Sequence, residues 1–89
     1  MAASVKFLPR ATRQLLIFTP PLQDEILAKT GMLSHFPYMG QPMEKAYVGY
    51  RCLLAGGGAY RIIYKIVSPV LVEIAYIRHC RRQMGLRIV

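Results

Sequence analysis

The chain has 89 residues, a formal net charge of +8 and a hydrophobic content of 54%. The high apolar content excludes an intrinsically disordered chain, and the length predicts a single domain over residues 1–89. The positive charge favours an anionic partner such as nucleic acid, an anionic membrane or an acidic protein; charge for solubility alone is the alternative interpretation.

The first half of the chain predicts a strand followed by two helices. Residues 4–8 (SVKFL) read as a short strand, and Pro9 can open the helix that follows. Apolar residues recur there at helical spacing, at Ala11, Leu15 and Phe18. Pro20 can begin a second helix that runs to about Ser34. Its predicted apolar stripe is Leu22, Ile26 and Leu33. The tight joint between the helices predicts an antiparallel helical hairpin.

The second half of the chain predicts a loop and three strands. Prolines and glycines indicate a loop over residues 36–49. Three segments are rich in Tyr, Ile and Val and are expected to be strands: residues 50–54, 59–67 and 70–79. Short connections at 55–59 and 68–69 predict hairpins, and therefore antiparallel pairing. The predicted fold is α+β, in the order β-α-α-β-β-β, with an antiparallel sheet packed on the helical hairpin.

Strand alternation predicts a basic face on this sheet. Four side chains of the middle strand are expected to face the helices: Tyr60, Ile62, Tyr64 and Ile66. Arg61 and Lys65 then lie on the open face, and a symmetrical turn at residues 68–69 places Arg61 opposite Tyr76. Arg51 and the basic end of the last strand are expected to share one concavity with Arg61. The alternatives are that Arg61 binds backbone carbonyls and that the basic strand end is simply solvated.

Other candidate sites are weaker. Five tyrosines could stack on bases, but tyrosine in strands more often packs: Tyr47, Tyr50, Tyr60, Tyr64 and Tyr76. The residues that could ligate a metal are scattered without ligand spacing: Cys52, Cys80, His35 and His79. We therefore expect no metal and no cofactor, and both cysteines are expected to be thiols.

The sequence predicts neither a membrane span nor a secretion signal. The longest apolar stretch is interrupted by charged residues and by Pro69, so it does not reach the roughly 18 residues of a span. The LLIF segment at 15–18 is too short for a signal-peptide core. A cytoplasmic protein is expected.

The pattern GYR...AYRIIYKI...VEIAYIRHCRR, which begins at Gly49 and ends at Arg82, resembles the RelE/ParE superfamily of type II toxin–antitoxin toxins, a superfamily that includes plasmid-stabilisation toxins. The resemblance extends to PRATRQL at 9–15 and to the P.MGQPM stretch at 37–43 in the loop. The short first helix is more similar to RelE than to the longer hairpin of ParE proteins. The resemblance implies a toxin that a cognate antitoxin neutralises by covering its sheet and groove.

The resemblance also implies an activity. RelE-type toxins are ribosome-dependent mRNA endoribonucleases, or mRNA interferases, whereas ParE-type toxins inhibit DNA gyrase without catalysis. The leading expectation is RelE-type cleavage, with the ribosome and mRNA as partners. The alternatives are inhibition of DNA gyrase and an inactive relative that only binds antitoxin.

Site residues follow from the resemblance position by position. Arg61 is expected to clamp the scissile phosphate, and Arg81 or Arg82 to stabilise the transition state or act as the acid. RNA-binding roles are implied for Arg51, Lys65 and Arg78. Leu53 stands where RelE has a second lysine, and Ile88 and Val89 end the chain where RelE has a tyrosine nearby. His79 is the expected substitute as general acid or base, with a surface residue at the strand end as the alternative.

Overall fold

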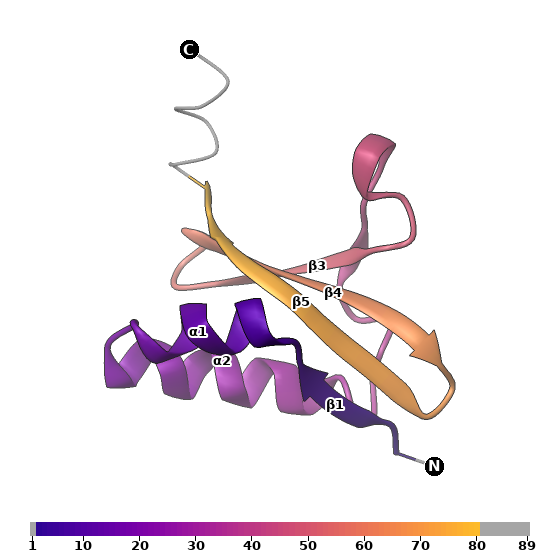
Figure 1. Ribbon diagram of the computed structural model, residues 1–89, viewed down its shortest axis with the longest axis horizontal. Coiled ribbons are helices and arrows are strands. Elements are labelled where there is room, and N and C mark those ends of the chain that lie inside the picture. The colour runs from indigo at the N-terminus through magenta and orange to yellow at the C-terminus, as the bar shows by residue number, and fades with distance from the viewer. Residues whose placement is uncertain (1, 81–89) are drawn as a thin grey trace.

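The structure is a computed structural model that describes residues 2–80 (Figure 1). The expected order of the main elements is confirmed, and the loop before the first hairpin contains a short strand and one turn of 3-10 helix. The elements are β1 (Ser4–Phe7), α1 (Pro9–Leu16), α2 (Pro20–Met32), β2 (Gln41–Pro42), η1 (Lys45–Tyr47), β3 (Arg51–Ala55), β4 (Tyr60–Ser68) and β5 (Leu71–His79). No helix in this part of the chain is long and apolar enough to cross a membrane.

The sheet has five strands in the order β1-β5-β4-β3-β2. β3, β4 and β5 pair antiparallel, as the hairpin connections predict, and the short β2 pairs antiparallel with β3. β1 adds to the other side of β5 and pairs parallel with it, so the antiparallel hairpin strands that the sequence predicts belong to a sheet that is mixed as a whole. No turn joins β1 to β5, and local turn chemistry therefore gives no information about the direction in which β1 adds to the sheet.

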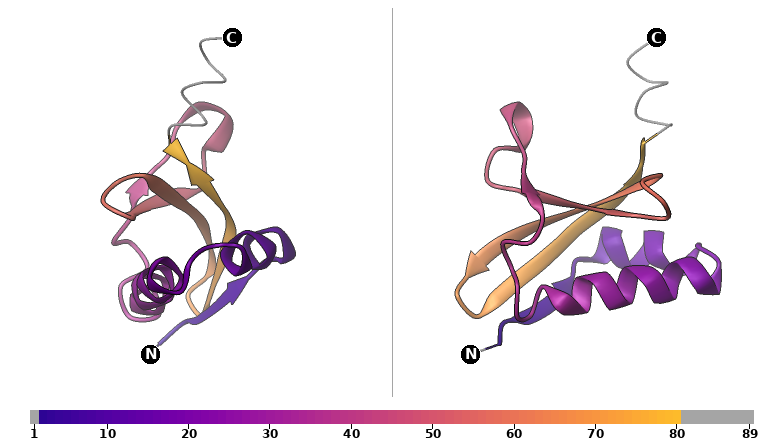
Figure 2. Two further views of the ribbon diagram at one scale, coloured as in Figure 1. Left: turned by 90° about the vertical axis from the view of Figure 1, so that its left-hand side faces the viewer. Right: turned by 180° about the vertical axis from the view of Figure 1, so that it is seen from behind.

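The two helices form a hairpin that covers one face of the sheet (Figures 1 and 2). A proline stands in the first turn of each helix, where its missing N–H leaves no intrahelical bond unmade. Gln23 Nε2 donates to the carbonyls of Leu15 at 3.0 Å and Phe18 at 3.1 Å, which closes the joint between the helices. The predicted helix stripes are confirmed at Ala11, Ile26 and Leu33, which are fully buried.

Tyr64 connects the core to the loop that follows α2. Its ring is fully buried, and its hydroxyl donates to Pro37 O at 2.7 Å and accepts from Gly40 N at 2.9 Å. A Cβ at Gly40 would stand 2.7 Å from both Cys52 O and the Tyr64 hydroxyl. Only glycine therefore fits where this loop crosses the strands, and the start of the segment that carries β2 and η1 is fixed relative to the sheet.

The register between β4 and β5 differs from the predicted one. Arg61 lies opposite Arg78, and Tyr76 lies opposite Ile63, so the expectation that Arg61 faces Tyr76 is wrong. The turn is centred one residue later than expected, because Ser68 pairs with Leu71 across it. This displacement moves the partner of Arg61 by two residues, which keeps it on the same face of the sheet.

Candidate nucleic-acid interface

The face of the sheet away from the helices carries most of the candidate site, and we call it the open face. Side chains of three strands contribute to it: Cys52, Leu54, Arg61, Ile63, Lys65, Glu73, Tyr76 and Arg78. The predicted alternation along β4 is confirmed, because Tyr60, Ile62, Tyr64 and Ile66 belong to or pack against the core shared with the helices. The β2–β3 segment with η1 rises on the side away from the helices (Figure 1).

Two arginines stand directly opposite each other at one end of the open face. Arg61 on β4 is the register partner of Arg78 on β5, whereas the acid of this face, Glu73, pairs with Lys65 farther along the strands. Like charges directly opposite each other in a sheet are destabilising. Within residues 2–80 no hydrogen bond or ion pair engages the Arg61 guanidinium, so the alternative in which it binds backbone carbonyls does not hold there. The pair creates a local positive potential that an anion would relieve.

Tyrosine rings surround the Arg78 side of this pair. Arg78 Nη1 donates to the Tyr47 hydroxyl at 2.6 Å, and the guanidinium lies 5.7 Å from the Tyr47 ring centroid and 5.4 Å from that of Tyr76. The two rings are 6.2 Å apart and tilted by 57°. Arg10, at the start of α1, approaches the Tyr76 ring at 5.8 Å. These contacts hold cations over π-faces, an arrangement that suits both phosphate binding and base stacking.

The two tyrosines of this cluster have pKa values displaced in opposite directions. A hydrogen bond with Tyr76 and then the charge of Arg78 lower the pKa of Tyr47. Burial, together with the hydrogen bond to Tyr47, raises the pKa of Tyr76 to about 12. Of the two phenols, Tyr47 is therefore the one that loses its proton first.

A groove opens on the other side of Arg61. Its volume is about 390 Å³, and it is lined by Gln41, Pro42, Met43, Glu44, Cys52, Leu54 and Arg61. Burial raises the pKa of the Cys52 thiol, although the nearby Arg61 charge opposes this effect. Cys52 is therefore a thiol at neutral pH, and Arg61 supplies positive charge to the groove wall.

Lys65 lies on the open face as predicted, at a distance from the arginine pair. Its ammonium group is 5.8 Å from the centroid of the Tyr50 ring, and Tyr50 also belongs to the segment before β3. Lys65 is exposed and lies opposite Glu73. It extends the row of cations along β4 beyond Ile63, which is 1% exposed between them.

Arg51 does not lie on the open face, so the expectation that it shares a concavity with Arg61 is wrong. It pairs with Tyr64, and it therefore points to the face that Tyr64 occupies. Its Nε donates to Gly40 O at 3.0 Å and its Nη2 to Tyr38 O at 3.1 Å, with the guanidinium 5.1 Å from the Tyr38 ring centroid. Arg51 holds the loop after α2 in place.

His79 is also separated from the arginine pair by the sheet. It pairs with Tyr60, and the two rings form an edge-to-face contact at 4.8 Å. Tyr60 in turn packs against Phe18 at 5.0 Å on the helix side. This position favours packing over acid–base chemistry at Arg61. Arg81 and Arg82, the predicted basic pair, lie outside the described residues.

Two members of the cluster were not singled out by the sequence. Tyr47 is one of five tyrosines among which the sequence shows no preference, and no sequence pattern points to Arg10. Both come from segments whose position over the sheet depends on long-range packing. The run of Tyr and Arg across the loop and β5 is the signal that the sequence offers, but it does not say which rings meet.

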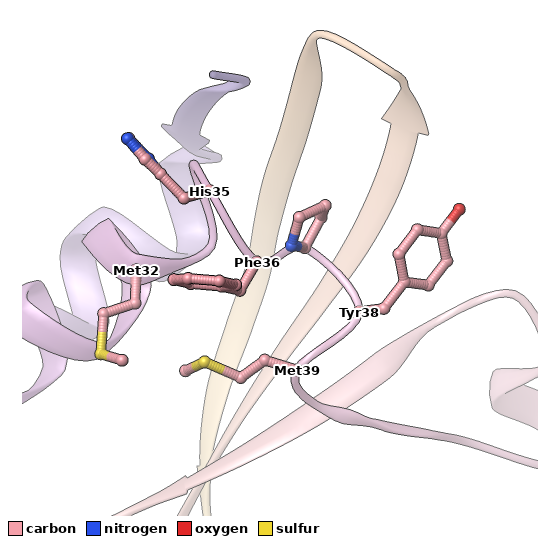
Figure 3. Close-up of a pocket in the computed structure, with 6 residues that line it drawn as sticks. Met32, His35, Phe36, Tyr38 and Met39 are labelled. Atoms are coloured by element: carbon pink, nitrogen blue, oxygen red, sulfur yellow. The ribbon is translucent and has the colours of Figure 1, made fainter. Parts of the chain in front are cut away.

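A second surface lies at the C-terminal end of α2. It is an apolar pocket of about 530 Å³, lined by Met32, His35, Phe36, Pro37, Tyr38 and Met39. Figure 3 shows the side chains of Met32, Phe36 and Met39 pointing toward one another, whereas His35 and Tyr38 point away from that group. Phe36 is 61% exposed, which is a large apolar surface to leave in water.

Comparison with known proteins identifies the relatives of this chain. The sequence profile of the family described as "ParE toxin of type II toxin-antitoxin system, parDE" matches residues 5–84. A search of curated protein sequences gives no match. The solved RelBE2 toxin–antitoxin complex from Mycobacterium tuberculosis contains a similar chain, 27% identical with a TM-score of 0.76, over 89% of this chain and 99% of that one.

Two further structures are similar in fold. A chain of the intact RelBE toxin–antitoxin complex of E. coli is 15% identical with a TM-score of 0.74, over 89% of this chain and 98% of that one. A chain of the chromosomal ParDE system from P. aeruginosa is 14% identical with a TM-score of 0.69, over 88% of this chain and 96% of that one. The fold is therefore common to systems named RelBE and ParDE.

Proposed function

The chain belongs to the RelE/ParE superfamily of type II toxin–antitoxin toxins, and on that basis we propose that it is a RelE-type endoribonuclease. It acts in the cytoplasm on mRNA held by the ribosome, and its partner outside that reaction is a cognate antitoxin. The reaction requires a 2′-hydroxyl to attack the adjacent phosphate, charge stabilisation on that phosphate, and a proton for the departing 5′-oxygen.

The observation that carries this proposal is the opposed pair Arg61 and Arg78. Two guanidinium groups on facing strands repel each other and destabilise the free sheet, so the arrangement is explained by an anionic ligand. A guanidinium binds phosphate with charge-assisted and often bidentate bonds. Arg61, which has no hydrogen-bonded or ion-paired partner among residues 2–80, is the residue free to clamp the scissile phosphate.

The remaining open-face residues support RNA binding around that phosphate. Tyr47 and Tyr76 present ring faces on which a base could stack, and Lys65 adds charge along the strand. Arg81 and Arg82 are proposed to belong to the site as well, and this part of the proposal depends on the resemblance alone. For Arg51 and His79 the contacts described above favour positioning of the fold over contact with RNA.

The antitoxin is proposed to be an acidic chain with apolar anchors, and the pocket at the end of α2 is proposed to receive one anchor. The pocket is wide, apolar and exposed, and Arg51 stacks on Tyr38 at its edge. The net charge of +8 favours an acidic partner. An apolar side chain of the antitoxin would occupy the space between Met32, Phe36 and Met39. Its carboxylates would lie toward Arg51 at the edge of the pocket.

Expression of the wild-type chain in cells tests the proposal directly. RelE-type activity should stop protein synthesis and leave breaks within translated mRNA, which primer extension can map. The family profile is named for ParE, which makes gyrase inhibition the competing activity. Intact mRNA together with cleaved gyrase–DNA complexes would reject the proposed nuclease and establish that alternative.

A further inference from the structure

The reaction needs a group that removes the proton of the 2′-hydroxyl, and a phenol oxygen lies beside the arginine pair of the open face. The Tyr47 hydroxyl accepts a 2.6 Å hydrogen bond from Arg78, the residue directly opposite Arg61. We infer that the Tyr47 hydroxyl is the proton acceptor of the cleavage reaction. This inference rests on the proposed function, because it assigns a role within that reaction.

The backbone places Tyr47 over the arginine pair. Tyr47 ends η1, the turn of 3-10 helix that lies before β3, yet its ring meets Tyr76 and Arg78 on β5. Ile63, on the intervening strand and opposite Tyr76, is 1% exposed on the face where this ring lies. A phosphate bound at Arg61 would therefore have the phenol oxygen on the Arg78 side and the groove of Glu44 and Cys52 on the other.

Several charged or titratable groups lie around Tyr47 or beside its neighbours. They are Tyr76 and Arg78 on β5, Arg10 on α1 against Tyr76, Lys65 on β4 against Tyr50, and the loop neighbours Glu44, Lys45 and Tyr50. Bonding from Tyr76 and the charge of Arg78 lower the pKa of Tyr47. Arginine stays protonated at any working pH, so it remains a donor whether Tyr47 is phenol or phenolate.

The chemical step is balanced with these groups. The Tyr47 phenolate takes the 2′-hydroxyl proton while the O2′–P bond forms and the P–O5′ bond breaks. The products are a 2′,3′-cyclic phosphate and a 5′-hydroxyl, whose proton comes from solvent water. Arg61 holds the non-bridging oxygens as their charge grows, and Arg78 holds the phenolate until the proton arrives.

Other residues of the described chain are less suited to this role. His79 lies on the helix face of the sheet against Tyr60. Burial raises the pKa of Cys52, which keeps its thiol protonated. Glu44 lines the groove beside Arg61, and it is the competing acceptor that the experiment must separate from Tyr47.

The test measures single-turnover cleavage of mRNA in stalled ribosome complexes. The proteins compared are the wild type, Tyr47→Phe, Glu44→Gln and Tyr60→Phe. Each is assayed across the pH range in which the complexes stay intact. Tyr47→Phe keeps the ring for stacking and removes only the hydroxyl. Tyr60→Phe is the matched control, because it makes the same change on the helix side of the sheet, next to Arg61 in sequence. Tyrosinate absorbance of each free protein is titrated in parallel.

We expect Tyr47→Phe to cleave roughly 100- to 10,000-fold more slowly, the usual contribution of a general base. The wild-type rate should rise about tenfold per pH unit below the pKa of Tyr47, and Tyr47→Phe should lose that rise. The tyrosine that titrates at the lowest pH in the wild type should be missing from Tyr47→Phe and present in Tyr60→Phe.

Three results would overturn the inference while leaving the proposed function standing. Tyr47→Phe could cleave as fast as the wild type, it could be slow but keep the wild-type pH slope, or Glu44→Gln alone could abolish that slope. A wild type that makes no breaks in mRNA overturns the proposed function as well. The cleavage result for the wild type therefore distinguishes failure of the inference from failure of the proposed function.

Discussion

Arg61 and Arg78 face each other directly across β4 and β5, on the face of the sheet that the helices leave open. Like charges that face each other directly destabilise a sheet. Arg61→Ala removes this repulsion and loses no hydrogen bond or ion pair within residues 2–80. We expect the variant to melt at or above the wild-type temperature. Inorganic phosphate should raise the melting temperature of the wild type more than that of the variant.

Arg51→Ala is the matched control for that measurement. Arg51 donates to the carbonyls of Gly40 and Tyr38, so its removal leaves two loop carbonyls without these donors. This variant should melt below the wild type. If the melting temperature of Arg61→Ala falls as far as that of Arg51→Ala, Arg61 stabilises the fold and its side chain is not held there for an anionic ligand.

Tyr64→Phe should reduce the free energy of unfolding by about 1–3 kcal/mol, the cost of leaving a buried polar group unpaired. The Tyr64 hydroxyl accepts from Gly40 N and donates to Pro37 O in a fully buried position, and phenylalanine satisfies neither. Denaturant unfolding followed by circular dichroism measures the loss. Tyr50→Phe, whose side chain is only partly buried, should change the unfolding free energy much less.

Glu25 should make the stability of the helix–hairpin contact depend on pH. Its carboxylate accepts from Gly56 N at 2.9 Å and lies 3.3 Å from Lys29 Nζ, and these contacts, the backbone bond first, lower its pKa. A pKa lowered by folding adds stability above the unfolded value, and that stability is lost as pH falls through the folded value. Glu25→Gln should therefore be less stable than the wild type at neutral pH.

The difference between these two proteins should shrink as the solution is acidified below the ordinary pKa of a glutamate. Urea unfolding at a series of pH values follows it. A difference that stays constant down to strongly acidic solution would show that the carboxylate charge is not what Gly56 and Lys29 recognise.

Phe36→Ser should weaken antitoxin binding and leave mRNA cleavage intact. Phe36 is an exposed wall of the apolar pocket, and the pocket lies at the end of α2 and not on the open face (Figure 3). Losing one apolar anchor from an interface typically costs more than about 1 kcal/mol when that anchor is central. Titration with the operon's antitoxin gives the dissociation constants. Val70→Ser, at the exposed β4–β5 turn, is the control. If Phe36→Ser and the wild type bind the antitoxin with equal affinity, the antitoxin does not bind in this pocket.

The sequence predicts the elements of this fold because their signals are local. Pro9 and Pro20 open the two helices, and apolar spacing defines the faces that Ala11 and Ile26 bury. The short connections predict both hairpins. The direction of β1 is not predictable in this way, because its partner β5 lies at the other end of the chain.

The candidate site is predictable only in part, because register depends on where each turn falls. Arg61 is placed on the open face by alternation within one strand, which needs no partner. The face of Arg51 depends on how β3 pairs across Gly56, Gly57 and Gly58, which all take positive φ angles of 61°, 67° and 93°. Such a flexible connection allows more than one pairing. Tyr47 reaches the site through a loop, where no periodicity exists to predict it.

Arg61 is proposed to clamp the scissile phosphate of mRNA, and this role can be tested by one paired measurement. Four proteins are compared: the wild type, Arg61→Ala, Arg61→Lys and the control Arg13→Ala, whose side chain is exposed on α1. Each is studied by thermal melting and by primer-extension mapping of mRNA on translating ribosomes. We expect breaks from the wild type and Arg13→Ala, a loss of roughly 100- to 1000-fold in Arg61→Ala, and partial rescue by lysine, which keeps the charge without the fork. All four should melt alike or, for Arg61→Ala, slightly higher. An Arg61→Ala protein that melts like the wild type and still cleaves mRNA at the wild-type rate would show that Arg61 does not clamp the scissile phosphate.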